Sequence, residues 1–412
     1  MAVVKPFRAV RPRTDLVDQV AALPYDVYNR KEAREAVKGK PYSFLNIDRP
    51  ETQFDESMDI YDEQVYKKAH ALLEGHIQSG VFLKDWSPCY YIYELTMDGR
   101  SQTGIVGCSS IDDYESGVIK KHENTRADKE IDRIRHVDAC NAQTGPIFLA
   151  YRSNEVIQKI IAEVKRDKEP LFDFVSEDGI KHCGWKISNP AMVEELEAAF
   201  ASIPNTYIAD GHHRAASAVK VGLGRRNQKE DYTGEEDFNY FLSVLFPDDE
   251  LYIMDYNRTV KDLNGYTRKE FIEKLEEDFI VEAVGQEPVS PKSKGTFGMY
   301  IDGKWYHMTA KPEICSEDPV KGLDVSVLQE YVLDKLLGIK DPKHDARVDF
   351  IGGIRGLKEL ERRADMDMRV SFSMYPTTIA ELFAVADASL LMPPKSTWFE
   401  PKLRSGLFIH QF

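Results

Sequence analysis

A short strand, a glycine turn and a helix follow one another between residues 205 and 219, and this order constrains the fold more than any other feature. Residues 205–209 are β-branched and aromatic, which predicts a buried strand. An Asp-Gly pair interrupts it, and the alanine-rich segment 212–219 predicts a helix. The start of this helix is predicted to be an anion site, because it offers free N–H groups, the positive end of the helix dipole and an arginine that can donate two hydrogen bonds. An ordinary solvated turn is the alternative. The candidate residues are Asp210, Gly211, His212, His213 and Arg214.

Composition narrows the class of protein. At 412 residues, the chain has room for two or three domains, and 42% hydrophobic with 30% charged residues is typical of a soluble globular protein. The net charge of −15 argues against a protein that holds DNA or RNA mainly through its phosphates. No segment reads as a membrane span or a signal peptide, and five scattered cysteines indicate reduced thiols. We therefore expect a cytoplasmic protein.

Strands and helices are mixed along the chain without strict alternation, which predicts an α+β (mixed α/β) fold. A boundary between Phe246 and Thr267 predicts an N-terminal region, 1–250, that carries the motifs, and a C-terminal α+β region, 251–412, packed against it. The expected strands are 3–10, 42–47, 89–95, 102–111, 144–151, 238–246, 347–351 and 369–374, with hairpins at 171–187 and 295–309. The expected helices are 55–80, 155–164, 191–202, 268–279, 324–337, one from 357 and one from 378, and residues 222–237 are expected to form a mobile loop.

A second charged segment follows a predicted strand at residues 120–130. His122 and Glu123 stand there among four cations, Lys120, Lys121, Arg126 and Arg133. A carboxylate near such cations can act as a general base that takes a proton from a substrate hydroxyl. A solvated, salt-bridged loop is the alternative, and spacing alone favours that alternative.

Three further side-chain roles have competing explanations. Asp210 can hold Mg²⁺ or bind a substrate amine, or it can simply form the turn. His212 and His213 are helix neighbours that point roughly 100° apart, which argues against zinc and favours donation to a phosphate. The tail residues Lys395, Ser396 and Thr397 have phosphate-binding side chains, although many surface loops do too.

Five short motifs together resemble one family. They are Lys5-Pro-Phe-Arg8, Pro24-Tyr-Asp26, His122-Glu-Asn-Thr125, Asp210-Gly-His-His-Arg214 and Met392-Pro-Pro-Lys-Ser-Thr397. On these motifs the chain is identified as a member of the bacterial and archaeal "domain of unknown function 1015" family, over residues 5 to 407. The family's name states that its function is not established.

The Asp-Gly-His-His-Arg element also resembles one in the ParB/sulfiredoxin-like superfamily, which implies a ParB/sulfiredoxin-like core with large additional mixed-sheet regions. In the free-serine kinases of that superfamily, a similar strand-turn-helix cradles nucleotide phosphates and an upstream glutamate is the base. The resemblance implies that Glu123 is the base and that Asp210 to Arg214, with His122 and the tail residues, bind phosphate and metal. A ParB-like site normally has an arginine-rich box here, whereas this chain has His212-His213-Arg214. This difference favours a kinase over a DNA-partition protein.

The resemblance implies a phosphotransferase that uses Mg²⁺ and ATP or ADP on a small hydroxyl compound, with free L-serine as the favoured substrate. The alternative is a regulatory protein of ParB-like type that binds a nucleotide or metabolite without turnover. Either function implies a nucleotide and a small molecule as partners and argues against nucleic acid and membranes. The oligomeric state is left open by the sequence.

Overall fold

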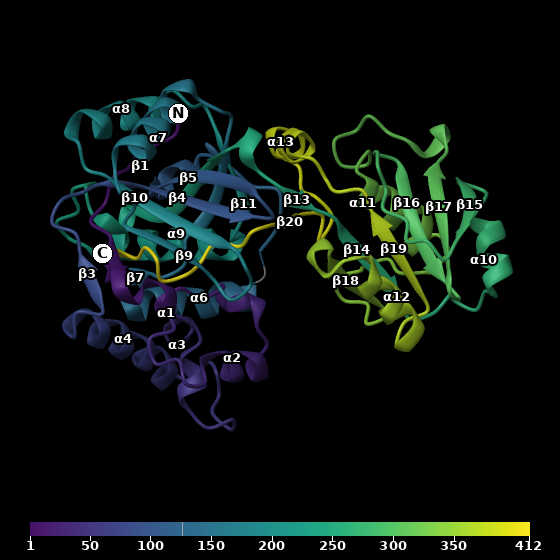
Figure 1. Cartoon of the computed structure of the whole chain (residues 1–412), viewed down its shortest axis with the longest axis horizontal. Coiled ribbons are helices and arrows are strands. Elements are labelled where there is room, and N and C mark those ends of the chain that lie inside the picture. The colour runs from purple at the N-terminus through teal and green to yellow at the C-terminus, as the bar shows by residue number, and fades with distance from the viewer. Residues whose placement is uncertain (126) are drawn as a thin grey trace. The chain divides into compact units, whose positions relative to one another are not determined.

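The computed structural model describes residues 1–125 and 127–412, without the side chains of residues 128 and 129. The chain divides into unit 1, Met1–Leu251 with Pro401–Phe412, and unit 2, Tyr252–Glu400 (Figure 1). The expected division at residues 250 and 251 differs from this one, because residues 401–412 belong to unit 1. That the second region packs against the first stays a prediction.

Unit 1 is built on a nine-stranded mixed sheet with the order β6-β11-β8-β12-β5-β4-β10-β9, and β1 pairs with β5. These strands are β1 (Val4–Lys5), β4 (Tyr90–Met97), β5 (Arg100–Ser110), β6 (Ile119–Lys120), β8 (Ile147–Tyr151), β9 (Phe172–Val175), β10 (Lys181–Ile187), β11 (Thr206–Asp210) and β12 (Tyr240–Pro247). Two small ribbons pair β2 (Val10–Pro12) with β3 (Phe82–Lys84) and β7 (Ala142–Gln143) with β21 (His410–Gln411). The second ribbon ties the C-terminal segment into unit 1.

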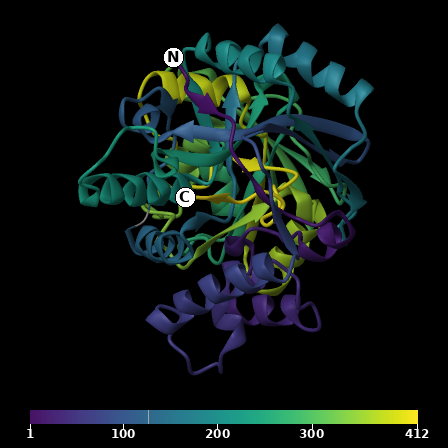
Figure 2. The same ribbon diagram turned by 90° about the vertical axis from the view of Figure 1, so that its left-hand side faces the viewer.

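The helices of unit 1 are α1 (Val17–Val20), α2 (Arg30–Val37), α3 (Leu45–Asp48), α4 (Glu63–Gln78), α5 (Ile111–Glu115), α6 (Ala127–Cys140), α7 (Glu155–Asp167), α8 (Pro190–Ala201) and α9 (His212–Gln228). Short 3₁₀ turns are η1 (Thr14–Leu16), η2 (Tyr25–Val27), η3 (Pro50–Gln53), η4 (Asp237–Asn239) and η5 (Asp248–Glu250). Apolar faces of α7, α8 and α9 share one core with the sheet. A second core lies among α2, α3, α4 and the first ribbon, and these helices lie together at one side of the unit in two views (Figures 1 and 2).

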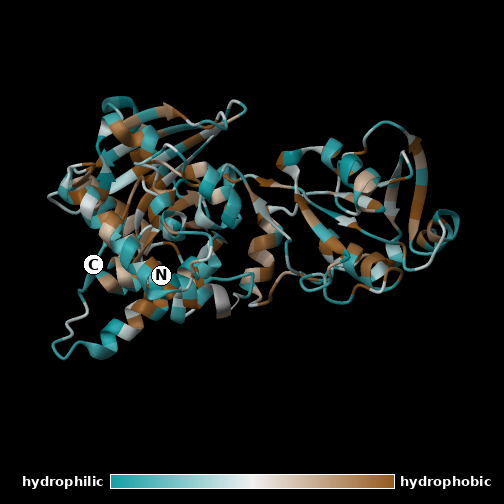
Figure 3. Cartoon of the chain, turned by 90° about the horizontal axis from the view of Figure 1, so that it is seen from below, coloured by the Kyte–Doolittle hydropathy of each residue, from teal (hydrophilic) through white to brown (hydrophobic). Residues whose placement is uncertain are grey.

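Unit 2 contains a six-stranded sheet with the order β15-β17-β16-β19-β14-β18. Its strands are β14 (Tyr256–Val260), β15 (Phe279–Gly285), β16 (Thr296–Ile301), β17 (Lys304–Ala310), β18 (Val348–Gly352) and β19 (Val370–Met374), and β13 (Ile253–Met254) pairs with β20 (Trp398–Phe399). Its helices are α10 (Arg268–Leu275), α11 (Asp324–Leu328), α12 (Leu357–Met366) and α13 (Ile379–Asp387), with short turns η6 (Pro312–Ile314) and η8 (Gly353–Arg355) and a π-helical segment, η7 (Gln329–Asp334). Hydrophobic residues, coloured brown, recur along the strands of both units (Figure 3).

The predicted mixed α/β fold is confirmed, but several local predictions were wrong, among them the strand expected over 3–10, which is divided into β1 and β2. The segment 42–47 was expected to be a strand but leads into α3, because six residues are too few for a period that distinguishes a strand from a buried helical turn. The helix expected over 55–80 begins only at Glu63, where Asp62 caps it. The loop expected at 222–237 is helical as far as Gln228, and Gly222 lets α9 approach the carbonyl of Phe238 closely.

Within residues 1–125 and 127–412, none of the helices combines the length and the apolar character that a membrane crossing requires.

Candidate phosphate-binding site

Strand pairing brings the two sequence motifs of unit 1 to one edge of its sheet. β6 and β11 run parallel, so the segments that follow them, which contain His122 and Gly211, leave the sheet at the same edge. β8 runs antiparallel to β11, with Asp210 opposite Phe148. The loop before β8 therefore reaches the same edge, and three separate segments of the chain meet there.

The turn after β11 depends on glycine. Gly211 caps α9 in the left-handed region, with φ 95° and ψ 30°, which side chains other than glycine rarely adopt. A Cβ atom at this position would lie only 3.1 Å from Cζ of Arg214. The turn starts α9 directly behind the strand, and the N–H groups of its first turn have no acceptor within the helix. The predicted strand-turn-helix is confirmed.

His122 and His212 form a buried pair at this edge. Their rings meet edge to face with centroids 4.5 Å apart, and the residues are only 2% and 7% exposed. Burial lowers the pKa of His122 to about 4, and burial with the neighbouring His122 holds the pKa of His212 well below its ordinary value. Both rings are neutral at pH 7, so they cannot add positive charge to a phosphate site.

We expect this pair to make unit 1 less stable as the pH falls. In the unfolded chain, His122 takes up a proton near its ordinary pKa of roughly 6.5, whereas in the folded chain it does so only near pH 4. The free energy of unfolding should therefore decrease between pH 6.5 and 4, by about 3 kcal/mol from His122 alone. Urea unfolding across this range measures the effect. His122→Gln should flatten the slope, whereas the exposed His70→Gln should not, and an unchanged slope in His122→Gln contradicts the assignment.

Asp210 lies between two cations. Its Oδ2 atom is 3.4 Å from Nζ of Lys402 and 3.5 Å from Nη2 of Arg214, and its Oδ1 accepts from the N–H of Gly211 at 3.0 Å. Burial by itself raises the pKa of Asp210, but Lys402 and Arg214 outweigh it and hold that pKa below its ordinary value. The carboxylate is charged and positions both cations.

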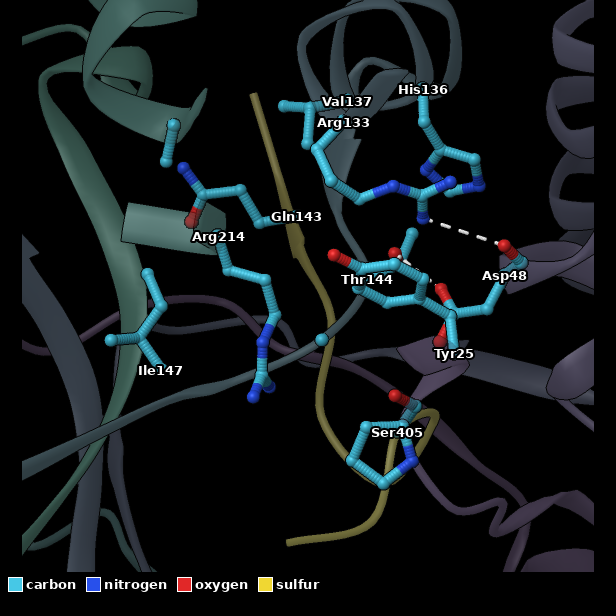
Figure 4. A pocket seen from close by; sticks show the side chains of 13 residues that line it. Tyr25, Asp48, Arg133, His136, Val137, Gln143, Thr144, Ile147, Arg214 and Ser405 are labelled. Carbon is cyan, nitrogen blue, oxygen red and sulfur yellow. Dashed lines mark hydrogen bonds between the residues drawn. The ribbon is translucent and has the colours of Figure 1, made fainter. Parts of the chain in front are cut away.

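Arg214 extends from α9 into a small pocket (Figure 4). Its side chain is 10% exposed, Nη1 donates to the carbonyl of Pro146, and Nε has no acceptor among the residues that the structure describes. A buried N–H group of a guanidinium without an acceptor costs free energy, and an anion can supply that acceptor. Arg214 is therefore the strongest candidate anion ligand of this pocket.

The opposite side of the pocket is formed by a second buried arginine and its partners (Figure 4). Cζ of Arg133 lies 4.1 Å from the ring centre of Tyr25, and its Nη2 is 2.8 Å from the carboxylate of Asp132. Thr144 donates its hydroxyl to Oδ1 of Asp48 at 2.8 Å. Burial raises the pKa of Tyr25 to about 12, so its phenol stays protonated. These contacts hold a charged, rigid wall opposite Arg214.

The size of the pocket limits what it can enclose. It leaves about 30 Å³ for the centres of water-sized molecules. One water needs roughly 10–15 Å³ on this scale, so the space is that of about two waters. The charged side chains in its lining are Asp48, Arg133 and Arg214, which are two cations and one carboxylate. It can enclose one small anionic group, such as a phosphate, but not a nucleoside.

The remaining predicted site residues are distributed over both units. Glu123 directly follows His122 and is half-buried. The carbonyl of His213, in the first turn of α9, accepts from the hydroxyl of Ser217 at 2.7 Å. Arg126, one of the cations expected around Glu123, lies outside the described residues. Unit 2 contains Lys395, Ser396 and Thr397. The hydroxyl of Ser396 donates to the carbonyl of Pro393 at 2.6 Å, and the role of these three residues in phosphate binding stays a prediction.

Sequence reasoning missed several residues of the pocket. Asp48, Thr144 and Ser405 line it, and Lys402 faces Asp210, although none of them was considered for the site. No local pattern indicates them, because the sheet and the second ribbon, β7 with β21, bring them together from distant segments. The sequence did draw attention to Pro24 and Tyr25, since they belong to one of the motifs on which the family resemblance rests.

Comparison with models of known protein families shows which family the chain belongs to. Residues 4–326 match the model of a family described as "Protein of unknown function (DUF1015)". The chain belongs to this family. The matched range includes four of the five motifs that suggested the resemblance, whereas residues 392–397 lie beyond it. No curated protein matches the sequence.

Several solved structures are similar to this chain at low identity. A point mutant of a free serine kinase in complex with AMP is 15% identical, covers 74% of this chain and 92% of its own, and has a TM-score of 0.36. A conserved hypothetical protein from Pyrococcus furiosus is 16% identical, covers 74% of this chain and 94% of its own, and has a TM-score of 0.34. C-terminally truncated SbnI from Staphylococcus aureus is 11% identical, covers 72% of this chain and 82% of its own, and has a TM-score of 0.38. What this chain binds is therefore inferred from its own residues.

Proposed function

We propose that the pocket at Arg214 binds a phosphate group and that the protein is a nucleotide-dependent kinase of a small hydroxyl compound, with free L-serine as the first candidate substrate. The observation that carries this proposal is the buried guanidinium of Arg214, whose Nε has no acceptor among the described residues and which lies in the first turn of a 17-residue helix. Arginine forks and helix N-termini both favour phosphate oxygens. The likeness of the Asp210–Arg214 segment to the free-serine kinases, stated above, supports the same reading.

The proposed reaction is an in-line phosphoryl transfer. Glu123 takes the proton from the substrate hydroxyl, whose oxygen attacks the terminal phosphorus of the nucleotide as the bond from that phosphorus to the bridging oxygen breaks. The products are a phosphate monoester and a nucleotide with one phosphate fewer. Such reactions depend on positioning and charge neutralisation more than on covalent chemistry by the protein. Arg214 and the α9 N-terminus serve that purpose here.

A metal role for Asp210 fits this arrangement poorly. Lys402 and Arg214 already neutralise its carboxylate at 3.4 and 3.5 Å. Among the residues that the structure describes, no group of three or more His, Cys, Asp and Glu side chains is suited to hold a metal ion. Mg²⁺ commonly keeps several waters and binds through nucleotide phosphates. We therefore assign Asp210 to positioning Arg214 and derive no step through a metal.

A second candidate function is binding of a phosphate-bearing nucleotide or metabolite without turnover. The small volume of the pocket favours it, since the pocket encloses a single anionic group and both histidines nearby are neutral. Such a regulator would gain thermal stability with the ligand and release no product.

Mass spectrometry of the full chain incubated with Mg²⁺, ATP or ADP and a mixture of hydroxyl amino acids separates the two functions. The kinase proposal predicts a phosphorylated amino acid. We expect Glu123→Gln to slow its formation by roughly 10²- to 10⁴-fold, the usual contribution of a general base. Glu115→Gln, an exposed carboxylate nearby in the sequence, is the matched control.

Wild-type rates in Glu123→Gln would show that the base is another residue. If no product forms but the nucleotide raises the unfolding temperature, the protein is a regulator instead.

A further inference from the structure

Unit 1 contains a second, much larger cleft that the proposed reaction does not use. It leaves about 560 Å³ for the centres of water-sized molecules and is lined by α1, the segment before α3, the turn between β9 and β10, and Arg404. Sites for small molecules enclose roughly 300–1,000 Å³. This Arg404 cleft is therefore large enough for a ligand that the small pocket at Arg214 cannot hold.

Arg404 is buried and held rigidly in the cleft lining. Its side chain is 4% exposed, and its Nη2 donates to the carboxylate of Asp178 and, at 3.1 Å, to the hydroxyl of Ser176. The Ser176 hydroxyl also bonds to Asp178 at 2.6 Å and to the ring of His182 at 3.0 Å. Nη1 of Arg404 has no acceptor in the described part of the chain. A fixed, buried guanidinium nitrogen without a partner is suited to donate a hydrogen bond to a ligand oxygen.

The charges around the cleft select the kind of ligand. Acids outnumber bases in its lining, with Asp18, Glu177 and Asp178 against Lys40 and Arg404. Lys40 is paired with Glu177 at 2.6 Å, whereas exposed Asp18 forms no ion pair with any described residue. A polyphosphate would meet net repulsion here. A ligand with both a carboxylate and an ammonium gains from Arg404 and from Asp18.

The rest of the lining is largely apolar. Tyr28, Tyr42, Leu23 and Leu45 contribute to it, and Val175 adds a side chain from the end of β9. Burial of apolar groups against such a surface contributes roughly 25 cal/mol per Å² of apolar area. The apolar lining favours a ligand whose side chain is apolar.

A narrow partition separates the cleft from the small pocket. Ala22 and Ser405 form an isolated antiparallel bridge, with N–H···O distances of 3.2 and 2.8 Å. Ser405 lines the small pocket, whereas its neighbour Arg404 lines the cleft. Successive residues of an extended segment face opposite sides, so the two spaces are distinct sites.

We propose that the Arg404 cleft binds a zwitterionic amino compound with an apolar side chain, either a free α-amino acid or a short peptide. Its carboxylate accepts from Nη1 of Arg404, and its ammonium faces Asp18. This site does not depend on phosphoryl transfer, and no nucleotide is needed to test it.

Calorimetric titration of the full chain without nucleotide tests the ligand class. The probes are L-leucine and leucyl-leucine, each compared with its C-terminal amide, which keeps the ammonium but lacks the carboxylate. We expect one of the two acids to bind and its amide to bind at least about tenfold more weakly, since a charged hydrogen bond contributes about 1.5–3 kcal/mol. Tighter binding of leucine supports the amino acid, and tighter binding of leucyl-leucine supports the peptide. Absence of binding by both at millimolar concentration, or equal binding of acid and amide, overturns the proposal.

Two variants test the residues. Arg404→Met should abolish binding of the better probe, with the exposed Arg166→Met of α7 as the matched control. Because Arg404 is buried and its loss can disturb folding, Asp18→Asn on the surface provides an independent test and should weaken binding about threefold or more. Wild-type affinity in Asp18→Asn, or in a folded Arg404→Met, overturns the assignment.

Discussion

Replacing Arg214 by lysine is expected to weaken the binding of ATP or ADP by roughly ten- to a hundredfold. Arginine presents several N–H donors in a fixed plane, whereas lysine presents a single flexible point charge. The loss of one charge-assisted hydrogen bond costs about 1.5–3 kcal/mol, which sets this range. Calorimetric titration of the wild type and Arg214→Lys with either nucleotide measures the change.

The matched control for Arg214→Lys is Arg225→Lys in the same helix. Nη2 of Arg225 pairs with Asp138 at 3.0 Å. This variant makes the same chemical change away from the pocket and should bind as the wild type does. If Arg214→Lys also keeps its affinity within twofold, Arg214 is not the phosphate ligand. The proposed kinase and the alternative regulator would then both lose their binding site.

The second large effect is expected from Asp85, which joins the first ribbon to the main sheet of unit 1. Its carboxylate accepts from Arg11, from the hydroxyl of Tyr91 at 2.6 Å and from Lys186 at 2.9 Å, and the residue is 8% exposed. Asp85→Ala leaves two cations and a buried phenol without their acceptor. We expect the free energy of unfolding to fall by about 3–5 kcal/mol. Urea unfolding followed by circular dichroism measures the loss.

The control for Asp85→Ala is Glu63→Ala, which removes an exposed ion pair with Lys67. An exposed pair contributes about 0–1 kcal/mol, so this variant should be nearly as stable as the wild type. Equal stability losses in the two variants would contradict the role of Asp85. Burial raises the pKa of Asp85, but its three partners outweigh that effect and lower it. Its stabilisation is therefore complete above roughly pH 4 and decreases as the pH falls further.

The sequence predicted the elements whose signals are local. The helices expected at 155–164 and 191–202 are present as α7 and α8, because their apolar period is helical and Asn154 and Asn189 cap them. The turn at Gly211 was equally predictable, since its positive φ requires glycine. By contrast, the segment 42–47 is too short to show a period, and its helical end is determined by burial against α4.

The sequence by itself determined the chemistry available at the candidate site: a glycine turn, a helix start, Asp210 and Arg214. Only the tertiary structure decided which groups act on them. Lys402 reaches Asp210 across 192 residues, and Tyr25, Asp48 and Arg133 form the wall opposite Arg214. The same packing buries His122 against His212 and leaves both rings neutral, which their order in the chain could not reveal. Local propensity fixes a turn, whereas charge and burial at a site depend on segments that strand pairing brings together.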